Sequence, residues 1–422
     1  MIANALLFLI RSVLALSLCA FLFYMGMSVW AALKWRKIKP EVDPAWTPGV
    51  SILKPVKGVD EDAYDNFSSY CRLDYPGEKI QLLFGVLDAE DPVIAVVARL
   101  KNEFPQHDIG IVVATDTAFP GANRKVCNLV NLLSRAKYEY LVLSDSDMRA
   151  EPDYLYRILA PFNPENQSPA SKIQVASPDE SAPRKVGMVT CPYRGGKATS
   201  FAAKLEALGI ASDFIPSALV SRALEGVSFA LGSTIVIPKT VLQEIGGFEP
   251  LLNQIADDFR LGNEVSKAGY EVVLSDYVIE DVIGNESFSN MWSRRLRWSK
   301  TLRVCRPAGY FGAFITHGFA LSLLFNVSVQ GHSAGWGAVA ATLFVRTSVA
   351  LFITLFCTGD RNVLRFLLFL PVSDLLNFAL YVSSFFGEEI VWRGERFRLF
   401  SDGRLEKKSF EVDQKFPRIE KK

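Results

Sequence analysis

Two aspartates that stand two positions apart are the first residues of this sequence that could do chemistry. Asp145 and Asp147 lie in the segment LVLSDSDM, directly after an apolar run. Carboxylates at positions i and i+2 on a chain that leaves a strand can both reach one hard divalent cation, and Mg²⁺ or Mn²⁺ prefers few carboxylates together with phosphate oxygens. Solvated aspartates in a turn are the alternative for a bare D-x-D motif. The preceding apolar strand and the motifs described next favour a metal site.

Further acidic residues stand on either side of this pair. Asp88 ends the apolar run LLFGVLD, and Asp257 and Asp258 lie in IADDFRLG. Taken alone, Asp88 could belong to a simple turn, and the adjacent pair could cap or begin a helix. Together, the motifs provide the base-and-ribose contact, the metal ligands and the catalytic carboxylate that a diphosphate-sugar substrate requires.

Cations follow in the segment RRLRW, just before a long apolar region. Arg294 and Arg297 are about one helical turn apart, so one helix face would present both to a leaving diphosphate, with Trp298 near the acceptor. An interfacial anchor where the chain enters a membrane is the alternative. Lys54, Lys57 and Lys125 lie near the expected nucleotide edge and are predicted to contact phosphates, although a lysine on a loop is usually solvated surface.

The elements that must position these residues alternate between apolar and amphipathic runs. VSIL, IQLLFGVLD, IGIVVAT and YLVLSDSD have the composition of strands, and amphipathic stretches separate them. This alternation predicts a parallel sheet covered by helices, with ligands at the carboxyl ends of the strands. The acidic residues that follow strand ends differ in this respect from ordinary surface carboxylates. Residues 161–185, rich in Pro, Ser, Asn and Glu, are predicted to form a flexible insertion.

Apolar segments flank this soluble region, which is predicted to span residues 40–306. Residues 2–33 are almost wholly apolar, which is longer than the ~20 residues that a spanning helix needs, and basic residues follow directly. Residues 1–39 are therefore predicted to be an uncleaved anchor whose C-terminal end faces the cytoplasm. Residues 307–390 form a second membrane region, and residues 391–422 are predicted to be a basic cytoplasmic tail.

The C-terminal membrane region contains three apolar segments, at residues 310–329, 336–357 and 363–386. Three crossings would leave the basic tail on the side opposite to the soluble domain, so one segment is predicted not to cross. Residues 363–386 are interrupted by Pro371 and Asp374 and are predicted to be re-entrant or interfacial, with Asp374 facing the protein interior. Residues 310–329, which contain polar side chains, are the other candidate.

Composition excludes several functional classes. Lys plus Arg number 46 and Asp plus Glu number 45, so the net charge is +1. A chain this close to neutral gives no indication of nucleic-acid binding. The six cysteines show no paired spacing, and with three histidines a zinc site or a disulfide framework is not expected. The mean hydropathy of +0.18 agrees with membrane segments.

The ordered motifs LKPVKGVD, LDYP, LLFGVLDAEDP, NRKVCNL, SDSD, ADDF and RRLRW resemble those of the ceramide glucosyltransferase family, glycosyltransferase family 21, over residues 49–298. The resemblance implies a bacterial member of a group of membrane-bound, inverting glycosyltransferases. Its fold would be an α/β GT-A domain, a Rossmann-like nucleotide-sugar-binding fold, joined to α-helical transmembrane segments. Animal members have a histidine before a Pro-Tyr pair, where this chain has Thr190 and Cys191.

The resemblance also implies a role for each motif residue. Asp88 would contact the uridine, and Asp147 with Asp145 would bind the metal and the diphosphate. Asp258 would be the catalytic base, and the C-terminal box would comprise Arg294, Arg297 and Trp298. The cofactor would be Mg²⁺ or Mn²⁺, and the donor a UDP-sugar.

The expected reaction is transfer of a hexose, glucose in the first place, from a UDP-sugar to the primary hydroxyl of a membrane lipid, ceramide in the first place, with inversion. The expected location is a bacterial inner membrane, with the catalytic domain in the cytoplasm. Transfer of N-acetylglucosamine or another sugar to a hopanoid or other polar lipid is the nearest alternative. A processive polysaccharide synthase, a transporter and a non-catalytic nucleotide- or lipid-binding module are disfavoured, the last because every acidic motif is intact. The oligomeric state is left open.

Overall fold

The structure, a computed structural model, describes residues 2–114, 121–167 and 184–408. A seven-stranded sheet with the order β3-β2-β1-β4-β8-β6-β9 forms the centre of the soluble domain. Its strands are β1 (Val50–Pro55), β2 (Ile80–Val86), β3 (Asp108–Val113), β4 (Tyr140–Leu143), β6 (Val186–Thr190), β8 (Ile235–Pro238) and β9 (Glu271–Leu274). Strands β3, β2, β1 and β4 are parallel, as predicted. Strand β8 runs antiparallel to both β4 and β6, so the sheet is mixed rather than wholly parallel.

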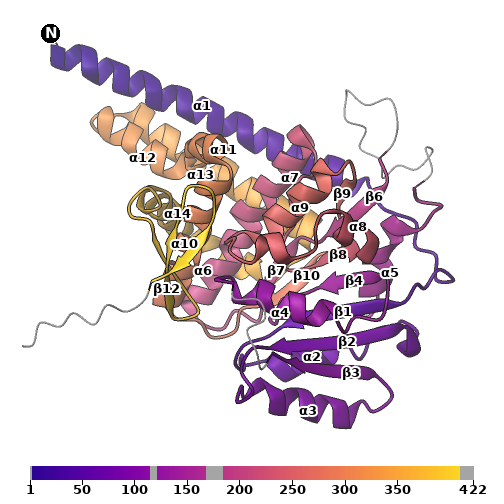
Figure 1. Cartoon of the computed structure of the whole chain (residues 1–422). Helices are drawn as coiled ribbons and strands as arrows, with labels where there is room; N and C mark the ends of the chain where they lie inside the picture. The colour runs from indigo at the N-terminus through magenta and orange to yellow at the C-terminus, as the bar shows by residue number, and fades with distance from the viewer. Residues whose placement is uncertain (1, 115–120, 168–183, 409–422) are drawn as a thin grey trace, which may run out of the picture.

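Apolar side chains of this sheet form two cores, one on each face. Every residue of β2 is buried, as expected for a strand that helices cover on both sides. One core includes α2 (Ala63–Ser69), α3 (Val93–Glu103) and α5 (Tyr154–Leu159), and the other includes α4 (Arg124–Leu133), α8 (Lys239–Glu244) and α9 (Asp257–Lys267). Short 3₁₀ helices lie at η1 (Gly77–Lys79), η2 (Ala160–Phe162) and η4 (Glu249–Leu251). Figure 1 shows the helices on the two faces of the sheet.

Two small sheets complete the soluble part. One has the order β5-β10-β7, formed by β5 (Met148–Arg149), β10 (Ile279–Val282) and β7 (Tyr193–Gly196). The other is antiparallel, formed by β11 (Glu389–Trp392), β12 (Glu395–Leu399) and β13 (Leu405–Lys407). The predicted basic tail therefore begins as an ordered sheet, which packs against α10 (Phe288–Cys305) (Figure 1). Residues 409–422 of that tail, and 168–183 of the predicted flexible insertion, lie outside the described residues.

Four helices of the described chain are long and apolar enough to cross a membrane: Ile2–Arg36, Phe201–Glu225, Ser333–Thr358 and Val363–Ser383. The first is α1 (Ile2–Arg36), and the second consists of α6 (Phe201–Gly209), η3 (Ile210–Phe214) and α7 (Ile215–Glu225). The third consists of α13 (Ser333–Ile353) and η6 (Thr354–Thr358). The fourth consists of η7 (Val363–Phe369) and α14 (Leu370–Ser383). Helix α1 packs along α7, α12 (Gly318–Ser328) and α13 (Figure 1). The helix at 201–225 was not anticipated as a membrane segment, because the sequence places it within the soluble domain.

The structure breaks the membrane region within residues 310–329, the second candidate, and not within residues 363–386, the segment predicted to be re-entrant. Residues Pro307–Thr316 and Gly318–Ser328 form two helical pieces that bend by 59° at His317, whereas Val363–Ser383 is long enough to span. The pieces are α11 (Pro307–Gly312) with η5 (Ala313–Thr316), and α12 (Gly318–Ser328). Each piece alone is too short to cross a bilayer. The bend makes this pair the better candidate for a broken span or a re-entrant segment.

A buried ion-pair cluster joins the apolar helices. Arg346 of α13 is only 2% exposed, and its guanidinium pairs with Asp374 of α14 at 2.9 Å and with Asp213 of η3. Asp374 therefore faces the protein interior, as predicted from its place in an apolar segment. Charges this deep are tolerated only when they are paired and hydrogen-bonded.

We predict that Arg346→Met lowers the thermal unfolding temperature in detergent strongly, because it leaves two carboxylates without their cation, a loss of ~3–5 kcal/mol. The triple variant that adds Asp213→Asn and Asp374→Asn should recover part of the loss. Arg365→Met, at an exposed arginine near the same helices, is the matched control and should unfold like the wild type. An unchanged melting temperature for Arg346→Met would contradict the proposed weight of this cluster.

Candidate active site

The strand ends, the start of α9, helix α10 and the C-terminal sheet together enclose a cleft of about 1080 Å³, which we call the main cleft. It contains the predicted acidic residues, the predicted arginine box and two of the three predicted lysines. Those that line it are Lys57, Asp88, Lys125, Asp145, Asp147, Asp257, Asp258, Arg294, Arg297 and Trp298. The structure thus brings together residues that span more than 200 positions of the sequence.

Lys54 is the exception, because its side chain is 0% exposed and lies beneath the cleft. Its Nζ donates to the backbone carbonyl of Asp145 at 2.8 Å and to Ser144 Oγ at 3.3 Å, and it lies over the Tyr70 ring. Burial lowers the pKa of Lys54 to about 7, although Asp147 and Asp145 act to raise it. This geometry makes Lys54 a residue that positions the D-x-D turn and not the phosphate contact expected from the sequence.

Asp147 has the clearest opening for a metal ion. Its Oδ1 is buried and has no hydrogen-bond partner among the described residues. Burial raises the pKa of Asp147 to about 6, the nearby charges of Asp145 and Asp60 act in the same direction, and Arg393 opposes them. Burial and the Asp147 charge likewise raise the pKa of Asp281 well above its ordinary value.

A divalent cation fits this crowded set of carboxylates, since its charge would relieve their mutual repulsion. Within the described ranges, no three metal-binding side chains gather at one point. Two carboxylates are sufficient for an ion that takes its remaining ligands from phosphate oxygens and water. Asp60 and Asp281 were not singled out from the sequence. Asp60 lies in the quoted motif LKPVKGVD, whereas Asp281 had no signal, because only the pairing of β10 with β5 brings it to the D-x-D turn.

Lys125 connects the D-x-D turn to the helix that carries the predicted base. Its Nζ lies 2.7 Å from Asp145 Oδ1 and 3.7 Å from Asp257 Oδ2. Burial acts to lower the pKa of Lys125, but Asp145, Asp257 and Asp258 outweigh it, and the pKa lies above its ordinary value. Asn123 holds the start of α4 in place, since its side chain accepts from the Val126 N–H. The capped first turn of α4 therefore fixes the position of the Lys125 backbone.

The carboxylate of Asp258 is fixed by two backbone groups. The Gly232 N–H donates to Oδ2 at 3.0 Å, and the Phe259 N–H donates to Oδ1 at 2.7 Å. Burial raises the pKa of Asp258 to about 6, and Asp257 adds to the shift while Lys125 opposes it. A carboxylate with a pKa in this range can accept a proton near neutral pH.

Two glycines allow these groups to approach one another. A Cβ at Gly232 would lie 3.1 Å from Lys125 Nζ and 3.2 Å from both Asp145 Oδ2 and Asp258 Oδ2. A Cβ at Gly262, one turn further along α9, would lie 2.5 Å from the backbone at residues 229–230. At position 262 only glycine lets α9 pack this closely against the loop before β8, and at position 232 a side chain would push the Lys125, Asp145 and Asp258 side chains apart by a few tenths of an ångström.

The two arginines of the box differ in their partners. Arg294 forms two hydrogen bonds with Glu286, at 2.7 and 2.5 Å, and its NH2 lies 3.5 Å from Glu206. Arg297 forms no ion pair with any residue that the structure describes, and it lies over the ring of Trp392. Burial lowers the pKa of Arg297 to about 10, with the Arg294 charge acting in the same direction. Arg297 is therefore the box arginine whose charge is available to an anion.

The remaining predicted residues lie at the edges of the main cleft. Asp88 is exposed, and its Oδ1 accepts from the Glu90 N–H at 3.0 Å, so it forms the turn considered as the alternative and also lines the cleft. Trp298 lines the cleft beside Arg294, whose guanidinium lies 5.5 Å from its ring centre. Thr190 and Cys191 are buried in the core at the end of β6.

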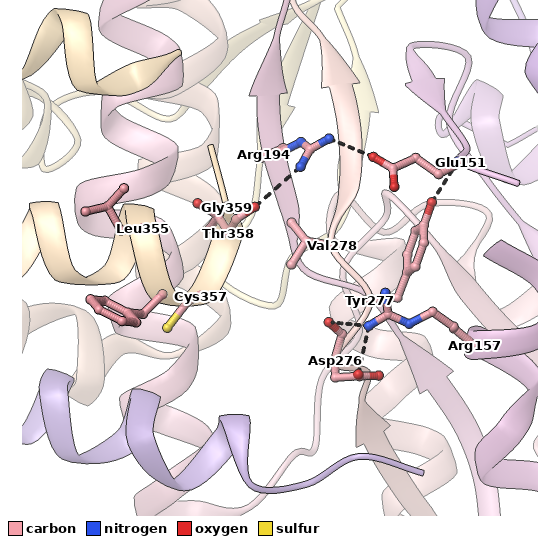
Figure 2. A pocket seen from close by; sticks show the side chains of 11 residues that line it. Glu151, Arg157, Arg194, Asp276, Tyr277, Val278, Leu355, Cys357, Thr358 and Gly359 are labelled. Carbon is pink, nitrogen blue, oxygen red and sulfur yellow. Dashed lines mark hydrogen bonds and ion pairs between the residues drawn. The ribbon is translucent and has the colours of Figure 1, made fainter. Parts of the chain in front are cut away.

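A smaller pocket of about 250 Å³ lies where the soluble domain meets the end of η6 (Figure 2). Its two arginines are already paired, Arg194 with Glu151 at 2.8 Å and Arg157 with Asp276 at 2.7 Å. Arg194 also donates to the carbonyl of Thr358 at 3.5 Å. These contacts join the two parts of the molecule, and each charged side chain among the described residues that line the pocket has a partner of opposite charge.

The mixed sheet, with its D-x-D turn at a strand end above the main cleft, defines a glycosyltransferase of the GT-A fold. A model of Glycosyl transferase family 21 matches residues 12–405, and the chain belongs to this family.

Individual relatives agree with this assignment. The chain is 24% identical to ceramide glucosyltransferase 1 of Caenorhabditis elegans over 409 residues, which is 93% of this chain and 81% of that protein. It is 33% identical to the ceramide glucosyltransferase of Candida albicans over 124 residues, 27% of this chain and 23% of that protein. The structure of a mannosyltransferase from Pyrobaculum calidifontis, solved with GDP-Man and Mn²⁺, superposes on this chain with a TM-score of 0.52. The superposition covers 89% of this chain and 99% of that one at 17% sequence identity, and it shows that the two share a fold.

We predict that Asp147→Ala weakens binding of UDP in the presence of Mn²⁺ and shifts the metal dependence to higher concentrations, with no loss of thermal stability. The carboxylate it removes is repelled by its neighbours and supports little core, so folding does not depend on it. Asp65→Ala, at an exposed aspartate on α2, is the matched control. A variant that melts early but responds normally to Mn²⁺ would show that Asp147 only supports the turn.

Proposed function

We propose that this protein transfers glucose from UDP-glucose to the primary hydroxyl of ceramide, or of a closely related membrane lipid, with inversion at the anomeric carbon. The observation that carries the proposal is the meeting of Asp145, Asp147, Asp258 and Arg297 in one cleft of a family 21 chain. The relatives named as ceramide glucosyltransferases support this donor and this acceptor.

The mechanism that fits these residues is a single displacement. The lipid oxygen forms a bond to the anomeric carbon while the bond from that carbon to the diphosphate oxygen breaks. Asp258 accepts the hydroxyl proton, and its two backbone hydrogen bonds hold the carboxylate in one orientation. Arg297 stabilises the negative charge that develops on the departing UDP. Attack from the face opposite the leaving group inverts the configuration.

Asp145 and Asp147 would hold a divalent cation, Mg²⁺ or Mn²⁺, which would neutralise charge on the diphosphate when bound. Lys125 holds Asp145 in place through its 2.7 Å contact. Asp88, at the exposed edge of the cleft, would contact the uridine. Lys54 holds the backbone of the D-x-D turn from below, as its contacts to Asp145 and Ser144 describe.

The apolar helices would deliver the acceptor. Arg295 of α10 donates to Asn377 Oδ1 at 2.6 Å, which ties the helix that carries the arginine box directly to α14. A lipid that keeps its chains in the bilayer could then present its head group at the cleft without leaving the membrane. Trp298, which also lines the cleft, would contact that head group.

We predict that Asp258→Asn binds UDP nearly as well as the wild type but turns over ~10²–10⁴-fold more slowly, the usual contribution of a general base. The kcat/KM of the wild type should fall as the pH drops through about 6, because the base must be ionised. Glu264→Gln, at an exposed carboxylate on the same helix, is the matched control and should retain full activity. Near-normal turnover in Asp258→Asn would remove it from the role of base.

The same assay tests the substrates. Purified protein would be given UDP-glucose, UDP-galactose or UDP-N-acetylglucosamine, each with ceramide or a hopanoid, and the product would be identified by mass and anomeric configuration. A β-glucosylceramide product supports the proposal, because the donor carries an α-linked sugar. Activity only with UDP-N-acetylglucosamine and a hopanoid would replace it with the alternative, and nucleotide binding without any transfer would favour a non-catalytic module.

We also propose that residues 1–39 anchor the protein in a bacterial inner membrane with the soluble domain, residues 40–306, in the cytoplasm. The basic residues after α1 support this orientation. In a cysteine-free background, Lys101→Cys on the exposed face of α3 should react with an impermeant thiol reagent only after the cells are permeabilised. Asn4→Cys at the exposed start of α1 should react in intact cells. The reverse pattern would overturn the orientation.

A further inference from the structure

The hairpin between β11 and β12 lies at the mouth of the main cleft. Its residues Trp392, Arg393, Gly394 and Glu395 all line the cleft. The sheet behind the hairpin is fixed to the rest of the protein: the Leu405 N–H donates to the Asn253 carbonyl at 2.8 Å, and the Ile255 N–H donates to the Gly403 carbonyl at 3.0 Å. Those contacts lie just before Asp257 and Asp258 in the sequence, so the hairpin is built onto the same wall as the predicted base.

The turn of this hairpin has an unusual residue at its tip. Arg393 has φ of +50° and Gly394 has φ of +81°. Two-residue hairpin turns with positive φ at both positions favour Asn-Gly or Asp-Gly, because a longer side chain is strained there. A non-glycine residue held in this region is uncommon and often marks a functional position. The chain therefore accepts some strain to place a guanidinium at this point.

Arg393 reaches across the cleft to the opposite wall. Its NH1 donates to the backbone carbonyl of Lys57 at 3.2 Å, which joins the hairpin to the loop after β1 over 336 positions of the sequence. The guanidinium forms no ion pair with a carboxylate in the described parts of the chain, although its charge acts on both Asp147 and Arg297. Arg297 in turn lies 5.2 Å from the ring centre of Trp392, the neighbouring hairpin residue.

We propose that Arg393 is a diphosphate-binding residue and that the hairpin at residues 392–395 closes the cleft over the donor. An uncompensated guanidinium between the D-x-D turn and Arg297 is complementary to a diphosphate, whose oxygens it can bind in pairs. On donor binding, the guanidinium exchanges the Lys57 carbonyl for phosphate oxygens. Trp392 keeps Arg297 oriented toward the same group. This inference rests on the proposed function in one respect, that the donor is a nucleoside diphosphate sugar.

The test is binding of UDP and of uridine to the full-length protein in detergent with Mn²⁺, which does not depend on turnover. Arg393→Gln should raise the Kd for UDP about tenfold or more, the value of one charge-assisted hydrogen bond, and should leave the Kd for uridine nearly unchanged. Arg396→Gln, at an exposed arginine of β12 that does not line the cleft, is the matched control and should bind both ligands normally.

A second variant separates binding from folding. Arg393→Asn places the residue that the turn prefers, so it should unfold at the same temperature as the wild type or higher while it loses UDP affinity. An equal loss for UDP and uridine, or normal UDP binding by both Arg393 variants, would overturn the proposal. Failure of the wild type itself to bind UDP would instead overturn the proposed function.

Discussion

Lys125 lies between two acidic motifs, with its Nζ 2.7 Å from Asp145 and 3.7 Å from Asp257, and this contact joins the end of β4 to the start of α9. Without a cation at this point, carboxylates from these two elements would repel one another in a partly closed space. The D-x-D turn could not then approach the helix that carries Asp258. The geometry that places the proposed metal-binding pair beside the proposed base therefore depends on this lysine.

The same arrangement leaves a surplus of negative charge, which the structure balances in two ways. Lys54 supports the turn from the buried side through the Asp145 carbonyl, where its charge is not exposed to solvent. On the open side, Arg297 and Arg393 face the carboxylates and form no ion pair with any carboxylate among the described residues. Two cations and a crowded acidic turn that face each other across a gap are complementary to a ligand that carries both a metal ion and a diphosphate.

The membrane helices take part in this arrangement through a continuous series of polar contacts. From Arg294, the series runs through Glu206 to Arg295, then through Asn377 and Asp213 to Arg346 and Asp374. The position of the arginine box is therefore set by the packing of α6, α13 and α14. A change in how these helices sit in a bilayer would alter the cation side of the cleft while the acidic side, built on the sheet, stayed in place.

Much of the site could be predicted because it depends on local sequence. Asp88, Asp145 and Asp147 follow apolar strands, and parallel strand ends meet at one edge of a sheet. The role of Lys54 could not be predicted, because an apolar strand does not show which way its one charged side chain points. Asp281 reaches the cleft only through the pairing of β10 with the distant strand β5. Arg393 reaches it only because the C-terminal sheet bonds to residues 253–255, far away in the sequence. The apolar composition of β8 did not show its direction either. The sequence therefore predicted a parallel sheet, whereas β8 runs antiparallel to its neighbours and makes the sheet mixed.

The Lys57–Arg393 contact also bears on the order in which the cleft is assembled during synthesis. The two residues are 336 positions apart, and all the apolar helices lie between them or before them. At roughly 5–20 residues per second, the ribosome reaches Arg393 tens of seconds after Lys57. The cleft is thus completed only after every membrane segment has been synthesised. A nascent chain whose apolar helices are not yet all synthesised lacks the hairpin at residues 392–395, so the order of synthesis makes completion of the cleft one of the last steps of assembly.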